Sequence, residues 1–346
     1  MRMFARKWGL LMTTNIRDVA KAAGVSVATV SKVLNGYTTV NQQTKEKVLR
    51  IVKETRFTPN SAARALVGRR SMTIGMFLTT GLAHPFFAHI LSGMEQTLKT
   101  MGYDLIYLTQ IQWAKEYSFV RHCQSRNVEG VVVFGFQEDD MDFSELIASG
   151  IPTLFIDLDV IGERTGFISS DNETSLLEAV RYLANLNHRR IAFLSAIESS
   201  YVTRQRLLGY RNGLAEAGIA LDPGYVVASD FTKEGGYVAM KRLLELPSRP
   251  SAVICSSDVG AIGAMEAIRE AGLSVPEDIS VIGFDDIELA VHMQPPLTTV
   301  RQDTNTIGRQ AIELLDAMIT DESKPPPEAI VPTELIIRDS CGPAKS

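Results

Sequence analysis

The chain has little of what most catalytic centres need. Its 346 residues include three cysteines and five histidines, and the cysteines lie far apart with no CxxC pair. We expect these cysteines to be buried free thiols, and we expect neither a metal site nor a cofactor. The sequence contains no GxxxxGK[ST], GxSxG or HExxH motif, and no GxGxxG follows its first strand-like run. These absences argue against the familiar catalytic centres, so we do not expect an enzyme.

Long apolar runs are also absent. No segment approaches the roughly 20 apolar residues that a membrane-spanning helix needs. The basic opening MRMFARKWGLL has an apolar part too short for a secretory signal, and no small-residue cleavage site follows it. We therefore expect a cytoplasmic protein with no membrane partner. Residues 1–12 are interpreted as an N-terminal extension, because MTTNIRDVA from Met12 would lead directly into the first expected helix.

Acidic residues are scarce at one end of the chain. Residues 1–70 hold 14 Lys and Arg against 3 Asp and Glu, a net charge of +11, so the whole-chain net of -5 leaves -16 for residues 71–346. A basic segment followed by an acidic remainder favours contact between that segment and a phosphate backbone. A solvated basic face and a membrane-surface arm are the alternative interpretations.

The segment IRDVAKAAGVSVATVSKVLNG, residues 16–36, predicts two short helices joined by a tight turn. Asn15 can cap the first helix, with Asp18 at its third position near the positive end of the helix dipole. Gly24 permits the sharp turn, and Ser26 can cap the second helix. This order of signals is typical of a helix-turn-helix, although other Ala- and Val-rich helical hairpins share it.

The second helix has two different faces. Val30, Val33 and Leu34 fall three or four residues apart and are expected to face inward. The candidate base-reading residues share the opposite face: Val27, Ala28, Ser31 and Lys32. This division between an apolar and an exposed face suits a helix that packs on one side and reads DNA with the other.

A third helix, capped by Asn41, completes an all-α DNA-binding domain that we expect over residues 13–58. Its core stripe consists of Val48, Ile51, Val52 and Phe57. Residues 59–71 read as a hinge helix or linker, from Pro59 to just beyond Gly68. One or two helical turns are too short to persist in water without a partner surface.

From residue 73 onward, strand-like and helix-like segments alternate as in parallel βαβ units. Near-continuous apolar strands indicate sheets covered on both faces, and eight strands are too many for one compact sheet with a single core. We therefore expect a two-lobed, doubly wound α/β body over residues 72–346. The expected strands are residues 73–79, 104–110, 130–135, 151–157, 190–196, 225–229, 252–257 and 280–286.

Polar residues recur at the carboxyl ends of these strands, where doubly wound sheets bind their ligands. They are Asp157, Ser257, Asp258, Asp285 and Asp286. Any one of them is more often a helix cap than a ligand contact. Several converging on one cleft, with Arg206 as a bidentate donor, would suit a polyhydroxylated ligand.

With these features together, the chain resembles the lactose, galactose and purine repressor (LacI/GalR) family of bacterial transcription regulators. The resemblance runs from about Asn15 to near the C-terminus. It is carried, in the family's order and spacing, by IRDVAKAAGVSVATVSKVLNG, RFTPNSAARAL, HPFFAHILSGME, NHRRIAFL, RQRLLGY, SVIGFDD and PPLTTVRQD.

The resemblance implies a homodimer at the nucleoid whose second helices enter successive major grooves of a near-palindromic operator. Lys32 stands where many relatives have Arg and lacks the fork that grips guanine. Leu66 matches the wedge that kinks DNA from the minor groove, with Ala63 beside it. The implied DNA-binding residues are Asn15, Ser26, Val27, Ala28, Thr29, Ser31, Lys32, Asn35, Asn60, Ala63 and Leu66.

For the body, the resemblance implies lobes like those of periplasmic sugar-binding proteins, joined by three crossings. We expect lobe 1 at about 72–170 and 304–331, and lobe 2 at about 171–303 and 332–346. The implied effector contacts are Phe86, Asp157, Arg204, Arg206, Phe231, Ser257 and Asp285, with Ser257 where relatives commonly have Asn. The effector is expected to be a sugar, sugar acid or sugar phosphate that changes affinity for DNA.

The function that follows is a sequence-specific transcription regulator, expected to be a repressor, switched by a small effector between its lobes. One rival is a sugar-phosphate enzyme with an accessory DNA-binding head. Such an enzyme would need a nucleophile, a metal-binding set or a phosphate-binding loop, and the sequence shows none of these motifs. Another is a transport-type sugar-binding protein, which would need an export signal and no basic head.

Overall fold

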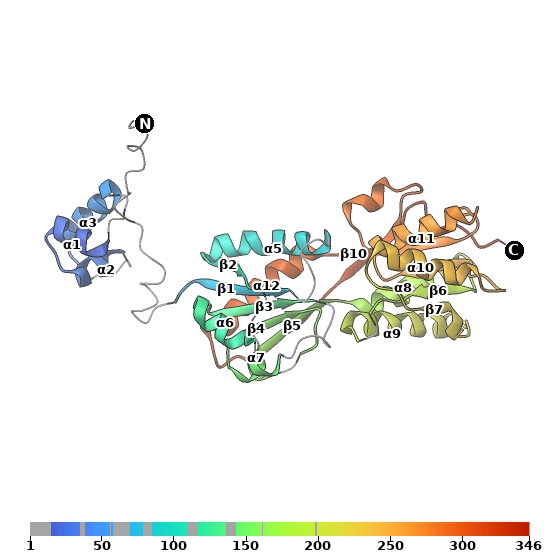
Figure 1. Cartoon of the computed structure of the whole chain (residues 1–346), viewed down its shortest axis with the longest axis horizontal. Helices are drawn as coiled ribbons and strands as arrows, with labels where there is room; N and C mark the ends of the chain where they lie inside the picture. The colour runs from blue at the N-terminus through green and yellow to red at the C-terminus, as the bar shows by residue number, and fades with distance from the viewer. Residues whose placement is uncertain are drawn as a thin grey trace, which may run out of the picture. The chain divides into compact units, whose positions relative to one another are not determined.

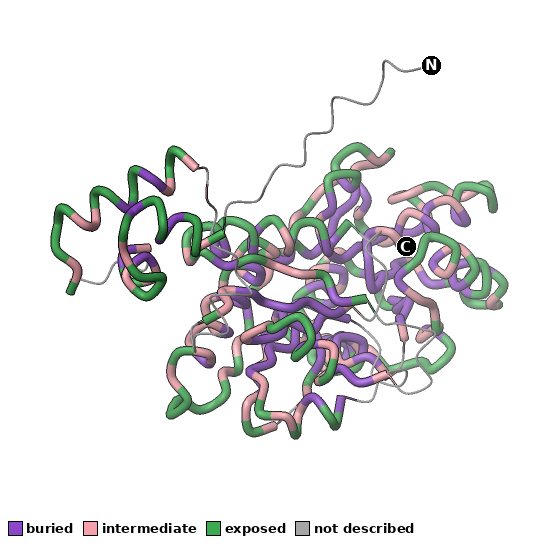
Figure 2. The backbone as a smooth tube through the Cα atoms, turned by 60° about the vertical axis from the view of Figure 1, so that its left-hand side comes forward, coloured by how far each residue is buried: buried purple, intermediate pink, exposed green. Residues whose placement is uncertain are grey.

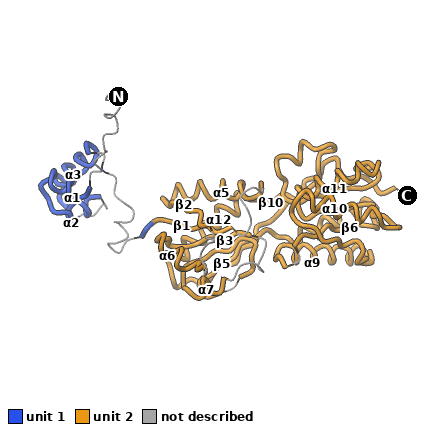
Figure 3. The backbone as a smooth tube through the Cα atoms, viewed as in Figure 1, with its two compact units in different colours: residues 1–71 blue, residues 72–346 orange. Residues whose placement is uncertain are grey.

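The computed structural model describes residues 15–34, 39–55, 57, 70–78, 85–109, 117–135, 143–160, 162–197 and 199–345. The chain divides into two compact units, residues 1–71 and 72–346 (Figure 3). The expected extension at 1–12, nearly all of the hinge, and Asn35, Asn60, Ala63 and Leu66 lie outside the described residues. In the part of the chain that the structure describes, no helix has the length and apolarity needed to cross a membrane.

The first unit contains three helices, α1 (Ile16–Ala23), α2 (Val27–Leu34) and α3 (Gln42–Thr55). Asn15 caps α1 in a reciprocal capping box: its Oδ1 accepts from the Asp18 amide at 3.1 Å, and Asp18 Oδ2 accepts from the Asn15 amide at 2.9 Å. Gly24 ends α1 in the left-handed region, with φ 65°. The local signals in the sequence therefore define this first helix and turn as predicted.

The same holds for the next two helices. Ser26 Oγ accepts from the Thr29 amide at 3.1 Å, and Asn41 Oδ1 accepts from the Thr44 amide at 2.8 Å. One apolar cluster joins the three helices, and it consists of Val19, Ala20, Ala23, Val30, Val33, Val48 and Ile51. Each helix buries one stripe in this cluster, which confirms the predicted inward face of α2.

The first lobe of the body is a six-stranded parallel sheet in the order β11-β5-β4-β3-β1-β2 (Figure 1). Helices α5 and α12 cover one face and α6 and α7 the other, each through its own apolar cluster. The strands are β1 (Thr73–Leu78), β2 (Asp104–Tyr107), β3 (Gly130–Phe134), β4 (Thr153–Ile156), β5 (Thr165–Ser170) and β11 (Glu328–Val331). The helices are α5 (Pro85–Met101), α6 (Phe119–Arg126), α7 (Ser144–Ala148) and α12 (Thr304–Thr320).

The second lobe repeats this architecture with the order β12-β10-β9-β8-β6-β7, in which β12 pairs antiparallel with β10. Helices α8 and α9 cover one face, and α10 and α11 cover the other. The strands are β6 (Ile191–Leu194), β7 (Val226–Val227), β8 (Ala252–Cys255), β9 (Ser280–Asp285), β10 (Thr298–Gln302) and β12 (Thr333–Ile336). The helices are α8 (Asn172–Asn185), α9 (Tyr201–Glu216), α10 (Lys233–Leu244) and α11 (Asp258–Glu270), with 3-10 turns η1 (Pro223–Tyr225) and η2 (Glu288–His292).

All eight expected strands are present. Six of them are largely buried, whereas β2 and β7 are partly exposed, and Figure 2 shows the buried residues gathered in the interior of the body. Four more strands, β5, β10, β11 and β12, are absent from the sequence-based expectation. The sequences of β5 and β10, TGFISS and TTVRQ, are too polar for an apolar-run criterion, and β11 and β12 are short, partly exposed edge strands. Neighbouring strands, rather than local pattern, stabilise these four.

The chain passes between the two sheets three times. Ser170 ends β5 before α8 begins at Asn172, Gln302 ends β10 before α12 begins at Thr304, and β11 and β12 are separated by Pro332 alone. Residues distant in sequence therefore meet where the lobes adjoin.

The three cysteines form no disulfide. Cys123 and Cys255 are buried, as expected, whereas Cys341 is half-buried. Burial raises the pKa of the Cys123 thiol to about 12, which keeps it protonated and unreactive at neutral pH.

Candidate functional site

The outer face of α2 presents a small set of side chains to solvent. Val27, Ala28 and Lys32 are exposed, and Thr29 and Ser31 are partly exposed. Val30 and Val33, on the inner face, are 0% and 3% exposed. Methyl groups and one ammonium group on a single helical face can contact thymine methyls and base acceptors in a major groove.

Two predicted DNA contacts also cap helices in the first unit. The side chains of Asn15 and Ser26 cap α1 and α2, and the Ser26 and Thr29 hydroxyls lie 2.9 Å apart. Both residues sit at helix N-termini, where backbone amides favour phosphate. Their contact with DNA stays a prediction.

In the body, Asp157 follows β4 and begins a chain of buried hydrogen bonds. The residue is 1% exposed, and Ser169 Oγ donates to its carboxylate at 2.6 Å. Asn172 Nδ2 donates to Ser169 Oγ at 3.1 Å, and Arg206 Nε donates to Asn172 Oδ1 at 2.8 Å. Residues from the first sheet thus connect to α9 of the second lobe.

Arg206 of α9 is a buried cation where the two lobes adjoin. Its guanidinium carbon lies 3.6 Å from the centroid of the Phe284 ring, and Nη1 donates to the Ser256 carbonyl. Burial lowers the pKa of Arg206 to about 10, and the carboxyls of Asp285 and Asp157 oppose that effect. Arg206 therefore stays charged at neutral pH. Its Nη2 makes no hydrogen bond within the described part of the chain and can donate to a ligand.

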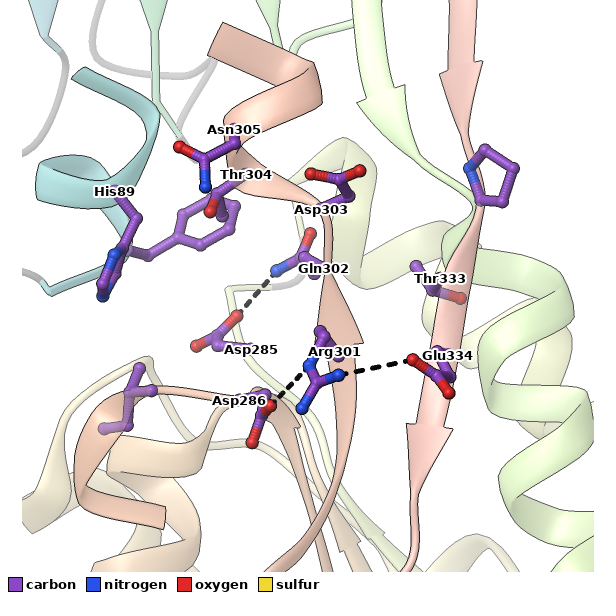
Figure 4. Close-up of a pocket in the computed structure, with 13 residues that line it drawn as sticks. His89, Asp285, Asp286, Arg301, Gln302, Asp303, Thr304, Asn305, Thr333 and Glu334 are labelled. Carbon is purple, nitrogen blue, oxygen red and sulfur yellow. Dashed lines mark hydrogen bonds and ion pairs between the residues drawn. The ribbon is translucent and has the colours of Figure 1, made fainter. Parts of the chain in front are cut away.

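Asp285 lies at the end of β9, and its charge acts on Arg206. Gln302 Nε2 donates to Asp285 Oδ1 at 2.7 Å (Figure 4). Burial raises the pKa of Asp285 to about 7, against the opposing effects of Arg206 and Gln302. Burial likewise raises the pKa of Asp157 to about 6, although the Ser169 hydrogen bond and Arg206 lower it. Two carboxyls thus share one guanidinium in a dry environment.

The backbone at these carboxyls is strained. Asp157, Asp285 and Asp286 have φ values of 61°, 118° and 56°. Non-glycine residues rarely adopt such angles, which cost about 1–3 kcal/mol each and occur often at ligand-binding sites. Both strands therefore end in a conformation that redirects a carboxylate away from the regular strand path.

A pocket of about 420 Å³ opens beside Asp285 (Figure 4). It includes two of the predicted effector contacts, Phe86 and Asp285, and draws residues from both lobes and from the crossings. Its other lining residues are His89, Asp286, Ile287, Arg301, Gln302, Asp303, Thr304, Asn305, Pro332, Thr333 and Glu334.

The two predicted aromatic contacts belong to one apolar cluster. Phe86 at the start of α5 and Phe231 before α10 are 2% and 8% exposed, and the cluster includes Val202 of α9. Tyr201 of α9 also contacts Phe167 of β5 edge-to-face, with centroids 5.0 Å apart. Apolar packing therefore spans both lobes beside the polar network.

Ser257 and Asp258 have local structural partners. Ser257 caps α11 by accepting from the Gly260 amide at 3.0 Å. Asp258 accepts from the Ile287 amide at 2.9 Å and from the Thr299 hydroxyl. Desolvation by burial, with the nearby Asp285 charge, raises the pKa of Asp258. The cap interpretation explains Ser257 without a ligand, so its effector role stays a prediction.

Arg204 points to a different partner from Arg206. Its Nη2 lies 3.1 Å from Asp159 Oδ1, and Nη1 donates to the Ser199 carbonyl. Asp159 follows β4 of the first lobe, so this pair spans the seam between lobes. Both side chains are more than 40% exposed.

Ser169, Asn172 and Gln302 are the functional candidates that sequence reasoning missed. Gln302 lies within PPLTTVRQD, a motif used for the family resemblance but given no role. Ser169 and Asn172 flank the end of β5, a strand that was not predicted. Within the described residues, no group of His, Cys, Asp and Glu side chains could hold a metal ion.

Comparisons with known proteins agree with this geometry. Residues 15–60 match the family described as bacterial regulatory proteins, lacI family, and residues 180–341 match the periplasmic binding protein-like domain. The ribose operon repressor of Haemophilus influenzae is 35% identical over 327 residues, covering 94% of this chain and 98% of that protein. The chain belongs to the lacI family. The repressor PurR of Photobacterium profundum is 33% identical over 328 residues, covering 94% and 98% of the two chains.

Solved structures of lacI-family regulators show the same fold. A complex of the regulator CelR with cellobiose is 32% identical, with a TM-score of 0.71 and coverage of 94% of this chain and 99% of that one. The lac repressor dimer bound to operator and the anti-inducer ONPF is 28% identical, with a TM-score of 0.80 and coverage of 95% and 99%. This lacI-family chain is accordingly a DNA-binding transcription regulator with a two-lobed α/β body, which confirms the predicted family and fold class.

Proposed function

We propose that this regulator is a homodimeric repressor whose affinity for a near-palindromic operator is switched by a small sugar or sugar derivative between its lobes. It acts in the cytoplasm at the nucleoid, where its DNA is, and it binds its effector without converting it. The proposed division is a DNA-binding domain at 13–58, a hinge at 59–71 and a body at 72–346. Lobe 1 comprises about 72–170 and 304–331, and lobe 2 about 171–303 and 332–346.

The observation that carries this proposal is the buried network of Asp157, Arg206 and Asp285. It draws on β4 of one lobe and on α9 and β9 of the other. A ligand that bonds to both sides has a higher affinity for the closed arrangement than for an open one. That difference in affinity is the coupling by which an effector can change the spacing of two DNA-binding heads.

The DNA side of the proposal depends on the exposed face of α2. Val27, Ala28 and Lys32 would contact base edges, with Thr29 and Ser31 near the backbone. From the family resemblance, Asn35, Asn60 and Ala63 add contacts, and Leu66 inserts into the minor groove. Because unstacking costs a few kcal/mol per step, both hinges must form together.

The effector side depends on donors and acceptors gathered where the two lobes adjoin, beside the pocket lined by Phe86 and Asp285. Arg206 offers N–H donors, and Asp157 and Asp285 offer acceptors, which matches the hydroxyls of a carbohydrate. Phe86 and Phe231 supply apolar surface for a sugar ring, and Arg204 and Ser257 border the cleft. The cellobiose, ribose and ONPF complexes of other lacI-family chains have ligands of this kind.

A binding-site selection tests the proposal. Full-length protein would be incubated with a random duplex library, and the affinity for enriched duplexes measured with and without a panel of carbohydrates, while product formation is followed in parallel. We expect an enriched near-palindrome, a change in its affinity with at least one carbohydrate, and no product. No preference for any duplex over competitor DNA at moderate ionic strength would refute the proposal, and turnover would restore the enzyme alternative.

A further inference from the structure

Two buried acceptors in the pocket have no donor. Asp285 Oδ2 and Gln302 Oε1 make no hydrogen bond within the described part of the chain, although the other polar atom of each is used in their mutual bond. Figure 4 shows these two oxygens pointing away from that bond. Buried polar atoms are normally paired, so both positions require a donor that the described residues do not supply.

The pocket wall carries an excess of negative charge. Its carboxylates are Asp285, Asp286, Asp303 and Glu334, and its permanent cation is Arg301. Arg301 is already engaged, with Nε 2.7 Å from Asp286 Oδ2 and Nη1 3.4 Å from Glu334 Oε2. Arg338, which does not line the pocket, lies 2.6 Å from Asp286 Oδ1, and four carboxylates still outnumber these two arginines. An anionic group entering this pocket would meet like charge without a free wall cation to offset it.

Arg206, the deeper cation, does not reverse this balance. Asp157 and Asp285 both act on its charge, so two carboxyls already face one guanidinium. Their pKa values are raised by burial, which shows how poorly this environment solvates additional negative charge. The remaining N–H groups of Arg206 can donate to a neutral hydroxyl oxygen as well as to an anion.

We propose that the cleft selects an uncharged polyol, whose hydroxyls donate to Asp285 Oδ2 and Gln302 Oε1, and discriminates against sugar acids and sugar phosphates. This inference rests on the proposed function, since it concerns the same effector. A volume of about 420 Å³ suits a small carbohydrate. A hydroxyl is both donor and acceptor, so one polyol can satisfy the two oxygens and Arg206 together.

Matched ligands test the charge preference with full-length protein. The series are D-glucose with D-glucuronate and D-glucose 6-phosphate, D-galactose with D-galacturonate, and D-ribose with D-ribose 5-phosphate. We expect the neutral member of the responding series to bind at least about tenfold more tightly than its anionic partners, the effect of one hydrogen bond to a charged group. Calorimetry on each ligand measures this ratio.

Three results would overturn the inference: equal binding of neutral and anionic partners, tighter binding of an acid or phosphate, or no binding of any neutral member at high concentration. Operator affinity measured in the same samples separates the two proposals. An acid that binds and changes operator affinity would leave the regulatory function standing and remove the polyol preference. A neutral sugar that binds without changing operator affinity would do the reverse.

A variant pair tests the acceptor itself. Asp285→Asn can keep its bond to Gln302 but presents an amide donor where the unpaired oxygen lies. Asp222→Asn removes the same charge from lobe 2 outside the pocket and keeps its cap on the Gly224 amide. We expect Asp285→Asn to lose about tenfold or more in affinity for the neutral sugar, and Asp222→Asn to match the wild type. Equal affinities in both variants would refute the acceptor role, provided that thermal melts show both folded.

Discussion

The candidate DNA contacts in the head of this regulator are exposed, whereas the candidate effector contacts in its body are buried. On α2, the candidate contacts Val27, Ala28 and Lys32 are exposed to solvent. In the body, Asp157, Arg206 and Asp285 are almost fully buried. Hydrogen bonds through Ser169 and Asn172 link Asp157 to Arg206, and the charge of Asp285 acts on Arg206. Changes on the head should therefore act separately, whereas changes in the buried network should propagate through it.

This difference in burial also determines how well each region tolerates substitutions. An exposed reader can be exchanged for another residue at a cost near that of one contact, because water solvates whatever remains. A buried charge that loses its partner keeps its desolvation cost and has no compensation. Effector specificity is therefore expected to change in large steps and operator preference in small ones.

The substitution Arg206→Ala is expected to have the largest effect on the body. Removing this cation leaves the buried carboxyls of Asp157 and Asp285 without the charge that stabilises them, and Asn172 Oδ1 without its donor. Such a change typically costs about 3–5 kcal/mol. We expect the effector response to disappear while the head still binds its operator. Arg211→Ala, on the exposed side of the same helix, is the matched control. Operator titrations with and without effector provide the measurement, and an unchanged response in Arg206→Ala would exclude it from the site.

The predictability of the two regions follows the same contrast. The head's caps at Asn15, Ser26 and Asn41 and its turn at Gly24 were predicted because each signal acts within four residues. The bonds of the body site join residues 12, 17 and 34 positions apart, such as Ser169 to Asp157 and Asn172 to Arg206. No periodicity encodes such pairings, so the strand-end carboxylates were predicted and their supporting residues were not.

Hydrogen bonds and ion pairs to nearby residues explain why some predicted effector contacts have other partners in the structure. The Ser257 hydroxyl already caps α11, and Arg204 is already paired with Asp159. A residue's position in a motif shows which elements it can reach, but not which of several partners it will bind. The strands β5 and β10 went unpredicted for a related reason, since their polar residues are stabilised by neighbouring strands rather than by an apolar pattern.

Lys32→Ala should have the next largest effect. If the ammonium contacts a base, specific operator binding should weaken by about 1–3 kcal/mol with a smaller loss on random DNA. Lys53→Ala, on the exposed side of α3, removes the same charge away from the reading face. Fluorescence anisotropy on operator and random duplexes distinguishes the cases. An equal loss on both duplexes would show that Lys32 contacts only phosphate.

The pH dependence of effector binding follows from the pKa of Asp285, which burial raises to about 7. A ligand hydroxyl that donates to the ionised carboxylate lowers that pKa, so the complex binds fewer protons than the free protein. Affinity for a neutral sugar should therefore increase as the pH rises toward 7 and level off above it, by up to about tenfold for each unit of pKa change.

Asp157, Asp258 and Arg206 lie close to Asp285 and interact with its charge. The variant Asp285→Asn is therefore needed to assign the pH dependence of effector binding to Asp285. It should remove the part of the profile centred near pH 7, and any dependence that remains near pH 6 belongs to Asp157, whose pKa burial raises to about 6. Calorimetry in buffers of different ionisation enthalpy would detect the released proton. A wild-type affinity that falls as the pH rises would contradict the assignment.

A smaller effect is expected at the head's first cap. Asn15→Ala removes the side-chain acceptor for the Arg17 and Asp18 amides, a loss of about 0.5–2 kcal/mol. Asn15→Asp keeps an acceptor at the same position and serves as the control. Hydrogen exchange of the α1 amides in the full-length protein measures the local opening. Unchanged protection in Asn15→Ala would show that α1 is stabilised by its packing on Val30 and Val48 alone.

The smallest and most discriminating change concerns Arg204. Its pair with Asp159 joins the lobes, whereas the similarly exposed pair of Arg181 and Glu216 joins two helices within one lobe. Exposed pairs contribute about 0.2–1 kcal/mol, so Arg204→Ala should weaken effector binding only a few-fold, by favouring the open arrangement. Arg181→Ala should leave effector affinity unchanged, because its pair survives opening. Complete loss of response in Arg204→Ala, as expected for Arg206→Ala, would instead make Arg204 a direct ligand contact, since a solvent-screened seam contact is too weak to abolish binding.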